Sequence, residues 1–223
     1  MTIKAVVFDF DDCLIRNFEF SSQELIDAAK AWNGQREPKL VIPDINVFAD
    51  HYYGSWDEWI LRMWPALEGH VDEFKAVCKT VPHRPRPAIP GAFRTLSILQ
   101  RKGFVIGILT NRESETMRQF LEESGLSAFS FDFIHSTADH GLRKPNPSAF
   151  GPVIADMEKR GIKLEETLYV GDQLDDVSCK NAGLKFVAVC SGVVSRNMFL
   201  ENGRNPNNII SSVSELPKYL RLE

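Results

Sequence analysis

The stretch Ala5-Val6-Val7-Phe8-Asp9-Phe10-Asp11 decides the fold class of this chain. Its first four residues are apolar and rich in β-branched side chains, which is typical of a strand buried on both faces of a parallel sheet. Similar apolar runs recur at residues 104–109, 131–134, 167–170 and 186–189. Helical patterns lie between these later runs. This alternation predicts an α/β fold with a doubly wound, mainly parallel sheet.

The predicted helices of this α/β part begin and end at recognisable signals. Pro90-Gly91 opens a helix that runs to Leu99, and Gly103 supplies its C-terminal cap. Further helical patterns lie at residues 114–123, 147–160 and 176–182. Together these helices are expected to cover both faces of the sheet.

Residues 16–86 interrupt the alternation of strands and helices. Ser21-Ser22-Gln23-Glu24 and Ser55-Trp56-Asp57-Glu58 each resemble a capping box that opens a helix. A third helix is expected at residues 71–78, before a stiff, proline-rich connector at residues 82–87. We therefore expect a small helical domain at residues 16–86, inserted into a main domain of residues 1–15 and 87–223.

The composition limits the possible partners. The chain has 223 residues, 43% of them hydrophobic, and no stretch approaches the roughly 20 apolar residues that span a bilayer. The formal net charge is -4 with scattered Lys and Arg, which argues against a nucleic-acid partner. The cysteines form no CxxC pair, so reduced thiols are expected. These features predict a cytoplasmic protein that acts on a small molecule and binds neither a membrane nor a nucleic acid.

Four short polar motifs follow one another along the chain. They are Asp9-Phe10-Asp11, Thr110-Asn111, Lys144-Pro145, and Gly171-Asp172 with Asp176. Taken alone, each motif has a structural explanation as a turn, a helix cap or a solvated loop lysine. The ordered set is much harder to produce by accident, and it predicts a phosphoryl-transfer site.

The residue types of these motifs suit phosphate chemistry. The adjacent carboxylates of Asp9 and Asp11 repel one another, and Asp172 and Asp176 add two more acids at the same sheet edge. A divalent cation relieves this repulsion, and oxygen ligands near a phosphate favour Mg²⁺. The positive charge of Lys144 and the hydrogen bonds of the Thr110-Asn111 turn can neutralise and hold the phosphate.

Other polar and aromatic residues are assigned no catalytic role. The histidines are scattered without ligand spacing, so no histidine metal site is expected. The aromatic residues of the insert are expected to form mainly its core, with a minority facing substrate. They are Tyr52, Tyr53, Trp56, Trp59 and Trp64.

At these motifs the chain closely resembles the haloacid dehalogenase-like hydrolase superfamily. It is most similar to the capped aspartyl phosphatases, which are phosphoglycolate phosphatase-like and carry a helical cap after the first motif. The resemblance runs from Lys4 to about Val189. It implies a Rossmann-like core, a cap formed by residues 16–86, and Mg²⁺-dependent hydrolysis of a small phosphate monoester metabolite.

The resemblance also implies a role for each motif residue. Asp9 is the nucleophile that forms an aspartyl-phosphate, and Asp11 is the general acid and later the general base. Mg²⁺ is bound by Asp9, the Asp11 carbonyl and Asp172, while Asp176 orients metal-bound water. The residues expected to bind the substrate phosphate are Thr110, Asn111 and Lys144.

Two features leave alternatives open. The usual Gly-Thr after the second aspartate of the first motif is replaced by Asp12-Cys13, where Cys13 is expected to be a small buried side chain. The same core also serves phosphomutases, and a non-catalytic phosphometabolite-binding protein would retain the fold. The motifs are expected to contact only the phosphate group, so they do not identify the rest of the substrate. The choice between monomer and homodimer is also open. The acid at Asp11 makes a dehalogenase, a phosphonate-cleaving enzyme or an ion-pumping ATPase unexpected.

Overall fold

The computed structural model describes residues 2–223, which form two compact units. Among these described residues, the α/β unit comprises residues 2–16 and Arg86–Glu223, and the helical unit comprises Asn17–Pro85. Each unit has its own hydrophobic core.

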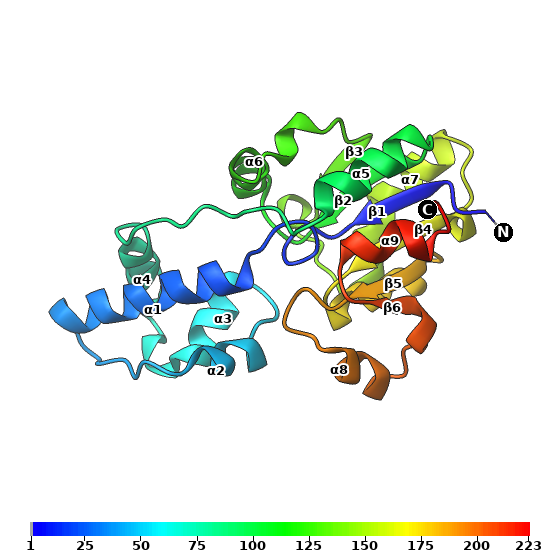
Figure 1. Cartoon of the computed structure of the whole chain (residues 1–223). Coiled ribbons are helices and arrows are strands. Elements are labelled where there is room, and N and C mark those ends of the chain that lie inside the picture. The colour runs from blue at the N-terminus through cyan, green and yellow to red at the C-terminus, as the bar shows by residue number, and fades with distance from the viewer. Residues whose placement is uncertain (1) are drawn as a thin grey trace. The chain divides into compact units, whose positions relative to one another are not determined.

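A parallel sheet of six strands forms the centre of the α/β unit, in the order β3-β2-β1-β4-β5-β6 (Figure 1). All pairings between neighbouring strands are parallel, so the predicted doubly wound parallel fold is confirmed. The short edge strand β6 was not predicted, because two residues are too few to show a periodic pattern. The strands are β1 (Ala5–Phe8), β2 (Val105–Thr110), β3 (Phe133–Ser136), β4 (Thr167–Gly171), β5 (Lys185–Val189) and β6 (Ile209–Ile210).

Helices cover both faces of this sheet, as expected. Successive residues of a strand face opposite ways, so Val6 and Phe8 pack with α5, α6 and α9, while Ala5 and Val7 pack with α7 and α8. The α-helices are α5 (Ala92–Arg101), α6 (Ser114–Glu123), α7 (Gly151–Lys159), α8 (Arg196–Glu201) and α9 (Leu216–Tyr219). The short 3-10 helices are η2 (Leu126–Ala128), η3 (Ala138–His140), η4 (Pro147–Phe150), η5 (Leu164–Glu166), η6 (Leu174–Lys180), η7 (Pro206–Asn208) and η8 (Val213–Glu215).

One predicted α-helix of the α/β unit is wrong. Residues 176–182 were expected to be α-helical, whereas the chain forms the 3-10 helix η6. The tighter turn is closed by a side chain, because Asp176 accepts a hydrogen bond from the backbone N–H of Gln173 at 3.0 Å. The predicted helix at 147–160 is present, but its first turn is the 3-10 helix η4.

The strand order places a natural binding position between β1 and β4. Connections from β1 run to one side of the sheet through β2 and β3, whereas β4, β5 and β6 lie on the other side. In such sheets, ligands bind outside the carboxyl ends of the strands at the point where the order reverses. Asp9 directly follows β1 and Asp172 directly follows β4.

The helical unit is built around a cluster of buried aromatic and aliphatic side chains, including Trp32, Phe48, Trp59 and Phe74. Trp59 and Trp64 are buried in it as expected, whereas Tyr53 and Trp56 are exposed. Its helices are α1 (Phe18–Gln35), α2 (Ile45–Asp50), α3 (Trp56–Met63), α4 (Val71–Cys78) and the 3-10 helix η1 (Pro65–Leu67).

One of the two predicted capping boxes is confirmed. Ser55 and Glu58 form a complete box at the start of α3. The predicted box at Ser21 is wrong, because α1 already begins at Phe18. The hydroxyl of Ser21 instead donates to the side-chain oxygen of Asn17 at 2.9 Å.

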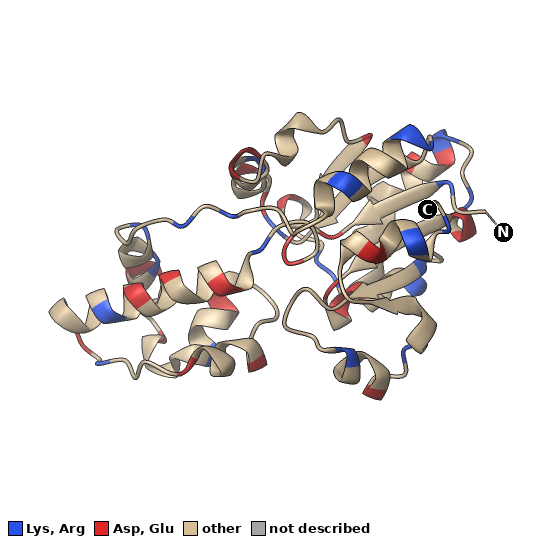
Figure 2. Ribbon diagram, in the orientation of Figure 1, with Lys and Arg blue, Asp and Glu red and all other residues tan. Residues whose placement is uncertain are grey.

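Charged residues of both signs are distributed along both units (Figure 2). Within residues 2–223, no helix combines the length and the apolar character that a membrane span requires.

Candidate active site

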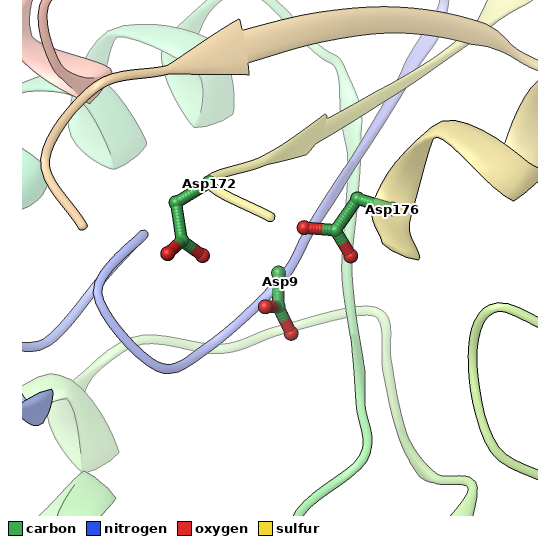
Figure 3. A group of neighbouring side chains, drawn as sticks. All are labelled: Asp9, Asp172 and Asp176. Carbon is green, nitrogen blue, oxygen red and sulfur yellow. The ribbon is translucent and has the colours of Figure 1, made fainter. Parts of the chain in front are cut away.

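Three buried aspartates come together at the carboxyl ends of β1 and β4 (Figure 3). We call Asp9, Asp172 and Asp176 the acid cluster. One carboxylate oxygen of each lies within 4.8 Å of those of the other two. Asp9 is 6% exposed, and the other two are fully buried. Three of the four predicted acidic residues thus lie in one place, although Asp9 is far from the other two in the sequence.

Two glycines allow the backbone to approach these carboxylates. A Cβ atom at Gly171 would overlap the Asp176 carboxylate, which explains why a glycine precedes Asp172 in the motif. A Cβ atom at Gly192, in the loop after β5, would overlap the Asp172 carboxylate. Gly192 was not among the predicted site residues, because its contact with Asp172 exists only when the ends of β4 and β5 lie side by side.

Lys144 lies inside the site and is only 5% exposed, so it is not a solvated loop lysine. Its Nζ lies 2.9 Å from Oδ1 of Asp9 and 2.6 Å from Oδ1 of Asp176. It also lies 2.8 Å from the hydroxyl of Tyr169. These three partners match the three donors of an ammonium group. The side chain is therefore fixed between two of the acids.

Asn111 fixes the backbone of Lys144. Its Oδ1 accepts from the Lys144 N–H at 2.8 Å, and its Nδ2 donates to the Lys144 carbonyl at 3.0 Å. Oδ1 also accepts from the hydroxyl of Thr137 at 2.7 Å. The amide of Asn111 thus positions the lysine. Its predicted contact with phosphate stays a prediction.

Thr110 ends β2 and is buried. Its Oγ1 accepts a hydrogen bond from the N–H of Arg112 at 3.1 Å. The following helix α6 begins only at Ser114, with Glu113 as its N-cap, so the Thr110-Asn111 motif is not the cap of this helix. The phosphate-binding role of Thr110 stays a prediction.

The carboxylate of Asp11 lies on Arg112 and is not part of the acid cluster. Arg112 Nε lies 3.1 Å from Oδ1 and 2.9 Å from Oδ2 of Asp11, and Nη2 lies 2.9 Å from Oδ1. The guanidinium of Arg112 also stacks 4.4 Å from the ring centre of Phe120. Arg112 is absent from the predicted site, although its position directly after Thr110-Asn111 could have indicated it.

Tyr169 is a second polar residue of the site that was not predicted. Its hydroxyl lies 3.0 Å from the carbonyl of Leu109, 2.8 Å from Lys144 Nζ and 3.3 Å from Oδ1 of Asp176. A buried tyrosine hydroxyl requires partners, so a tyrosine within the apolar strand β4 was the available signal.

Burial and repulsion dominate the electrostatics of the site. Burial raises the pKa of Asp9 from 3.8 to about 7, against the opposing attraction of Lys144. Burial, together with the charge of neighbouring aspartates, also raises the pKa of Asp172 well above its usual value. Although burial disfavours the ammonium form, Asp176 and Asp9 raise the pKa of Lys144. Burial is thus the largest cause of the raised pKa values of both aspartates, whereas the negative charge of Asp176 and Asp9 favours the ammonium form of Lys144.

The chemistry of the site fits a divalent cation. Within residues 2–223, no hydrogen-bond donor reaches the buried Oδ1 of Asp172. A buried polar atom normally has a partner, and a bound Mg²⁺ would provide one while relieving the repulsion. Asp9 and Asp172 are the candidate side-chain ligands. Asp176 is held by Lys144 and Gln173, which suits a supporting position.

The unusual Asp12-Cys13 pair forms the turn after the first motif. Asp12 has a positive φ of 52°, and its carbonyl accepts from the hydroxyl of Ser191 at 2.6 Å. Cys13 is fully buried, and burial raises the pKa of its thiol well above the usual value. Cys13 is therefore a small core side chain, as expected.

Residues 3–182 match the family of haloacid dehalogenase-like hydrolases. The chain belongs to this family. This confirms the predicted family and its classification as a hydrolytic enzyme. The acid cluster of this haloacid dehalogenase-like hydrolase follows β1 and β4 and lies inside the matched region.

Two relatives and one solved structure illustrate this haloacid dehalogenase-like relationship. The pyrophosphatase PpaX of Bacillus mycoides (strain KBAB4) is 29% identical over 223 residues, covering 97% of this chain and 96% of the relative. The phosphoglycolate phosphatase of Vibrio parahaemolyticus is 31% identical over 128 residues, covering 57% of this chain and 54% of the relative. A HAD-superfamily hydrolase of subfamily IA, variant 1, from Geobacter sulfurreducens has a TM-score of 0.70 at 22% identity, covering 98% of this chain and 96% of that one. The last similarity shows the fold.

Proposed function

We propose that the protein is a Mg²⁺-dependent phosphatase that hydrolyses a small phosphate monoester metabolite through an aspartyl-phosphate on Asp9. The observation that carries this proposal is the position of Lys144, buried between Asp9 and Asp176, two members of the acid cluster. The names of the two relatives, a pyrophosphatase and a phosphoglycolate phosphatase, support phosphate chemistry.

In the first step, a carboxylate oxygen of Asp9 attacks the phosphorus, and the bond from phosphorus to the leaving oxygen breaks. Lys144 holds Asp9 in place and offers positive charge to the transferred phosphoryl group. Bound Mg²⁺, held by Asp9, Asp172 and the Asp11 carbonyl, would neutralise negative charge on that group. Thr110 and Asn111 are proposed to hydrogen-bond the phosphate oxygens.

Asp11 is proposed to move the protons. It donates a proton to the leaving oxygen, and then accepts one from the water that attacks phosphorus. The second attack releases inorganic phosphate and restores the Asp9 carboxylate. Because the Asp11 carboxylate lies on Arg112 in this structure, it must leave Arg112 before it can reach the leaving oxygen.

The helical insert, residues 16–86, is proposed to be the cap of a core formed by residues 1–15 and 87–223. Its tasks are to exclude bulk water from the aspartyl-phosphate and to recognise the part of the substrate beyond the phosphate. The enzyme is proposed to act on free metabolites in the cytoplasm as a monomer or homodimer.

Phosphate release from a panel of phosphorylated metabolites tests the proposal. We expect turnover that requires Mg²⁺, is abolished by EDTA and is lost in Asp9→Asn, while the nearby Asp175→Asn variant remains active. Formation of an isomeric phosphate ester without inorganic phosphate would identify a phosphomutase. Binding of phosphorylated metabolites without any turnover would identify a non-catalytic protein.

A further inference from the structure

We propose that Arg112 is an anion subsite for the leaving group, so that preferred substrates carry a second negative group close to the scissile phosphate. That group is a carboxylate or a second phosphate. The inference rests on the proposed function, because Asp11, the partner of Arg112, is the acid proposed to protonate the leaving oxygen.

The contact between Arg112 and Asp11 shows what this subsite can bind. Nε and Nη2 of Arg112 both donate to the carboxylate, at 2.9–3.1 Å. A guanidinium presents its donors in a fixed planar fork that matches carboxylate and phosphate equally well. The Asp11 carboxylate therefore occupies the position that an anionic group of the substrate would take.

The Arg112 side chain is held in place for this task. Its guanidinium stacks on Phe120, and the guanidinium of Arg86 lies 4.9 Å from the centre of the same ring. The Arg112 carbonyl accepts from the hydroxyl of Ser136 at 2.7 Å, and its N–H donates to Thr110. An arginine fixed in this way loses little conformational freedom on binding a ligand.

The Arg112–Asp11 pair is more exposed to solvent than Lys144, which lies within the acid cluster. The side chains of Arg112 and Asp11 are 19% and 21% exposed, whereas that of Lys144 is 3% exposed. Lys144 is already in contact with Asp9, Asp176 and Tyr169. A second anion of the substrate would thus meet its positive partner at Arg112.

Binding of this anion also explains how Asp11 becomes available. When the leaving-group anion takes the two donors of Arg112, it displaces the Asp11 carboxylate, which is then free to turn toward the leaving oxygen. A neutral leaving group cannot compete in this way, and Asp11 stays on Arg112. Arg112 therefore selects substrates through both binding and the release of the acid.

Matched substrate pairs test the subsite. Phosphoglycolate is compared with 2-hydroxyethyl phosphate, and ethylene glycol bisphosphate with 2-methoxyethyl phosphate, as kcat/KM at saturating Mg²⁺; all four are monoesters of primary alcohols. In the wild type we expect the anionic member of at least one pair to be favoured by about 10- to 100-fold, as for a charged hydrogen bond. The pair with the larger preference shows whether the natural anion is a carboxylate or a phosphate.

Variants assign this preference to Arg112. In Arg112→Met the ratio within each pair should fall to near one, and in Arg112→Lys, which keeps the charge without the fork, it should be intermediate. Arg118→Met, which removes an exposed arginine of α6, serves as the control and should keep the wild-type ratio. Equal losses on both members of each pair in Arg112→Met would show that Arg112 only positions Asp11, and would overturn the inference.

A binding measurement decides the question even without turnover. Calorimetry on Asp9→Asn should show tighter binding of phosphoglycolate or ethylene glycol bisphosphate than of the neutral partner, and this difference should vanish in Asp9→Asn/Arg112→Met. A wild type that hydrolyses all four compounds without preference contradicts the subsite alone. Absence of Mg²⁺-dependent phosphate release from these compounds and from the whole metabolite panel contradicts the proposed function, while calorimetry still tests the subsite.

Discussion

The Nζ of Lys144 lies 2.9 Å from Oδ1 of Asp9, and both side chains are buried at the carboxyl edge of the sheet. The cation reaches the acid from a loop that follows β3, whereas Asp9 directly follows β1. Their pairing depends on Asn111, which holds the Lys144 backbone through two hydrogen bonds. Charge and position at this site are thus supplied by different segments of the chain.

Replacing Lys144 by Met tests the role of this charge. The variant retains much of the side-chain volume but leaves Asp9 and Asp176 without their cation, so kcat should fall by about 100- to 1000-fold. Inhibition by vanadate, an anion that resembles the transferred phosphoryl group, should weaken as well. Lys159→Met, which changes an exposed lysine of α7, is the matched control. An unchanged vanadate inhibition constant would remove Lys144 from the phosphate site.

Asp11→Asn should impair proton transfer in a way that depends on the leaving group. Loss of a general acid typically costs about 100- to 10,000-fold, and the cost is smaller when the leaving oxygen needs no proton. We therefore expect a large loss of kcat on an alkyl phosphate and a clearly smaller one on p-nitrophenyl phosphate. Equal losses on both substrates would argue against the proton-transfer role.

Tyr169→Phe tests a positioning residue. The substitution removes the hydroxyl that contacts Lys144 Nζ and leaves one buried donor unpaired, so kcat should fall by about 10-fold. Because Tyr169 is not proposed to touch the substrate, KM should change little. Tyr219→Phe, in α9, removes a hydroxyl that contacts Asn208 and should leave kcat unaltered. A rise in KM at constant kcat would contradict the positioning role.

Without metal, the stability of the α/β unit should depend on pH. The pKa of Asp9 is raised from 3.8 to about 7 and that of Asp172 is raised well above its usual value, in both cases mainly by burial. The folded state therefore binds more protons than the unfolded state, and its stability falls as pH rises from about 4 to about 7. Mg²⁺ binds the ionised carboxylates, so the rise in Tm that it causes should grow over the same range.

Thermal unfolding in EDTA and in Mg²⁺ measures this effect. Asp172→Asn, which cannot ionise at this position, should show a flatter pH dependence in EDTA and a smaller rise in Tm with Mg²⁺. A Tm that increases with pH in EDTA would contradict the assigned direction of the pKa shifts.

Much of the α/β fold could be predicted because it depends on local patterns. The apolar runs at β1, β2, β4 and β5 stand out from their surroundings, and α6 begins and ends at the predicted residues. The predicted starts of η6 and α1 were wrong, because the local signals lay inside the helices that form. Asp176 closes the tight turn of η6, and α1 begins before the serines that resemble its cap.

The polar motifs indicated the site, but not its internal contacts. The acid cluster could be predicted since strand ends meet at one edge of a parallel sheet. Two contacts of the site are tertiary: Arg112 binds Asp11, and Tyr169 contacts Lys144. Each joins residues that are far apart in the sequence. Neither contact follows a repeating pattern, so neither could be read from spacing alone.

Trapping the phosphorylated enzyme tests the central claim most directly. The wild type is mixed with substrate and Mg²⁺, treated with borohydride, which reduces an acyl phosphate to an alcohol, and digested for mass spectrometry. We predict homoserine in place of Asp9, only when substrate and Mg²⁺ are both present, and no such product in Asp9→Asn. Modification at another carboxylate, or rapid phosphate release with no product at Asp9, would contradict the account.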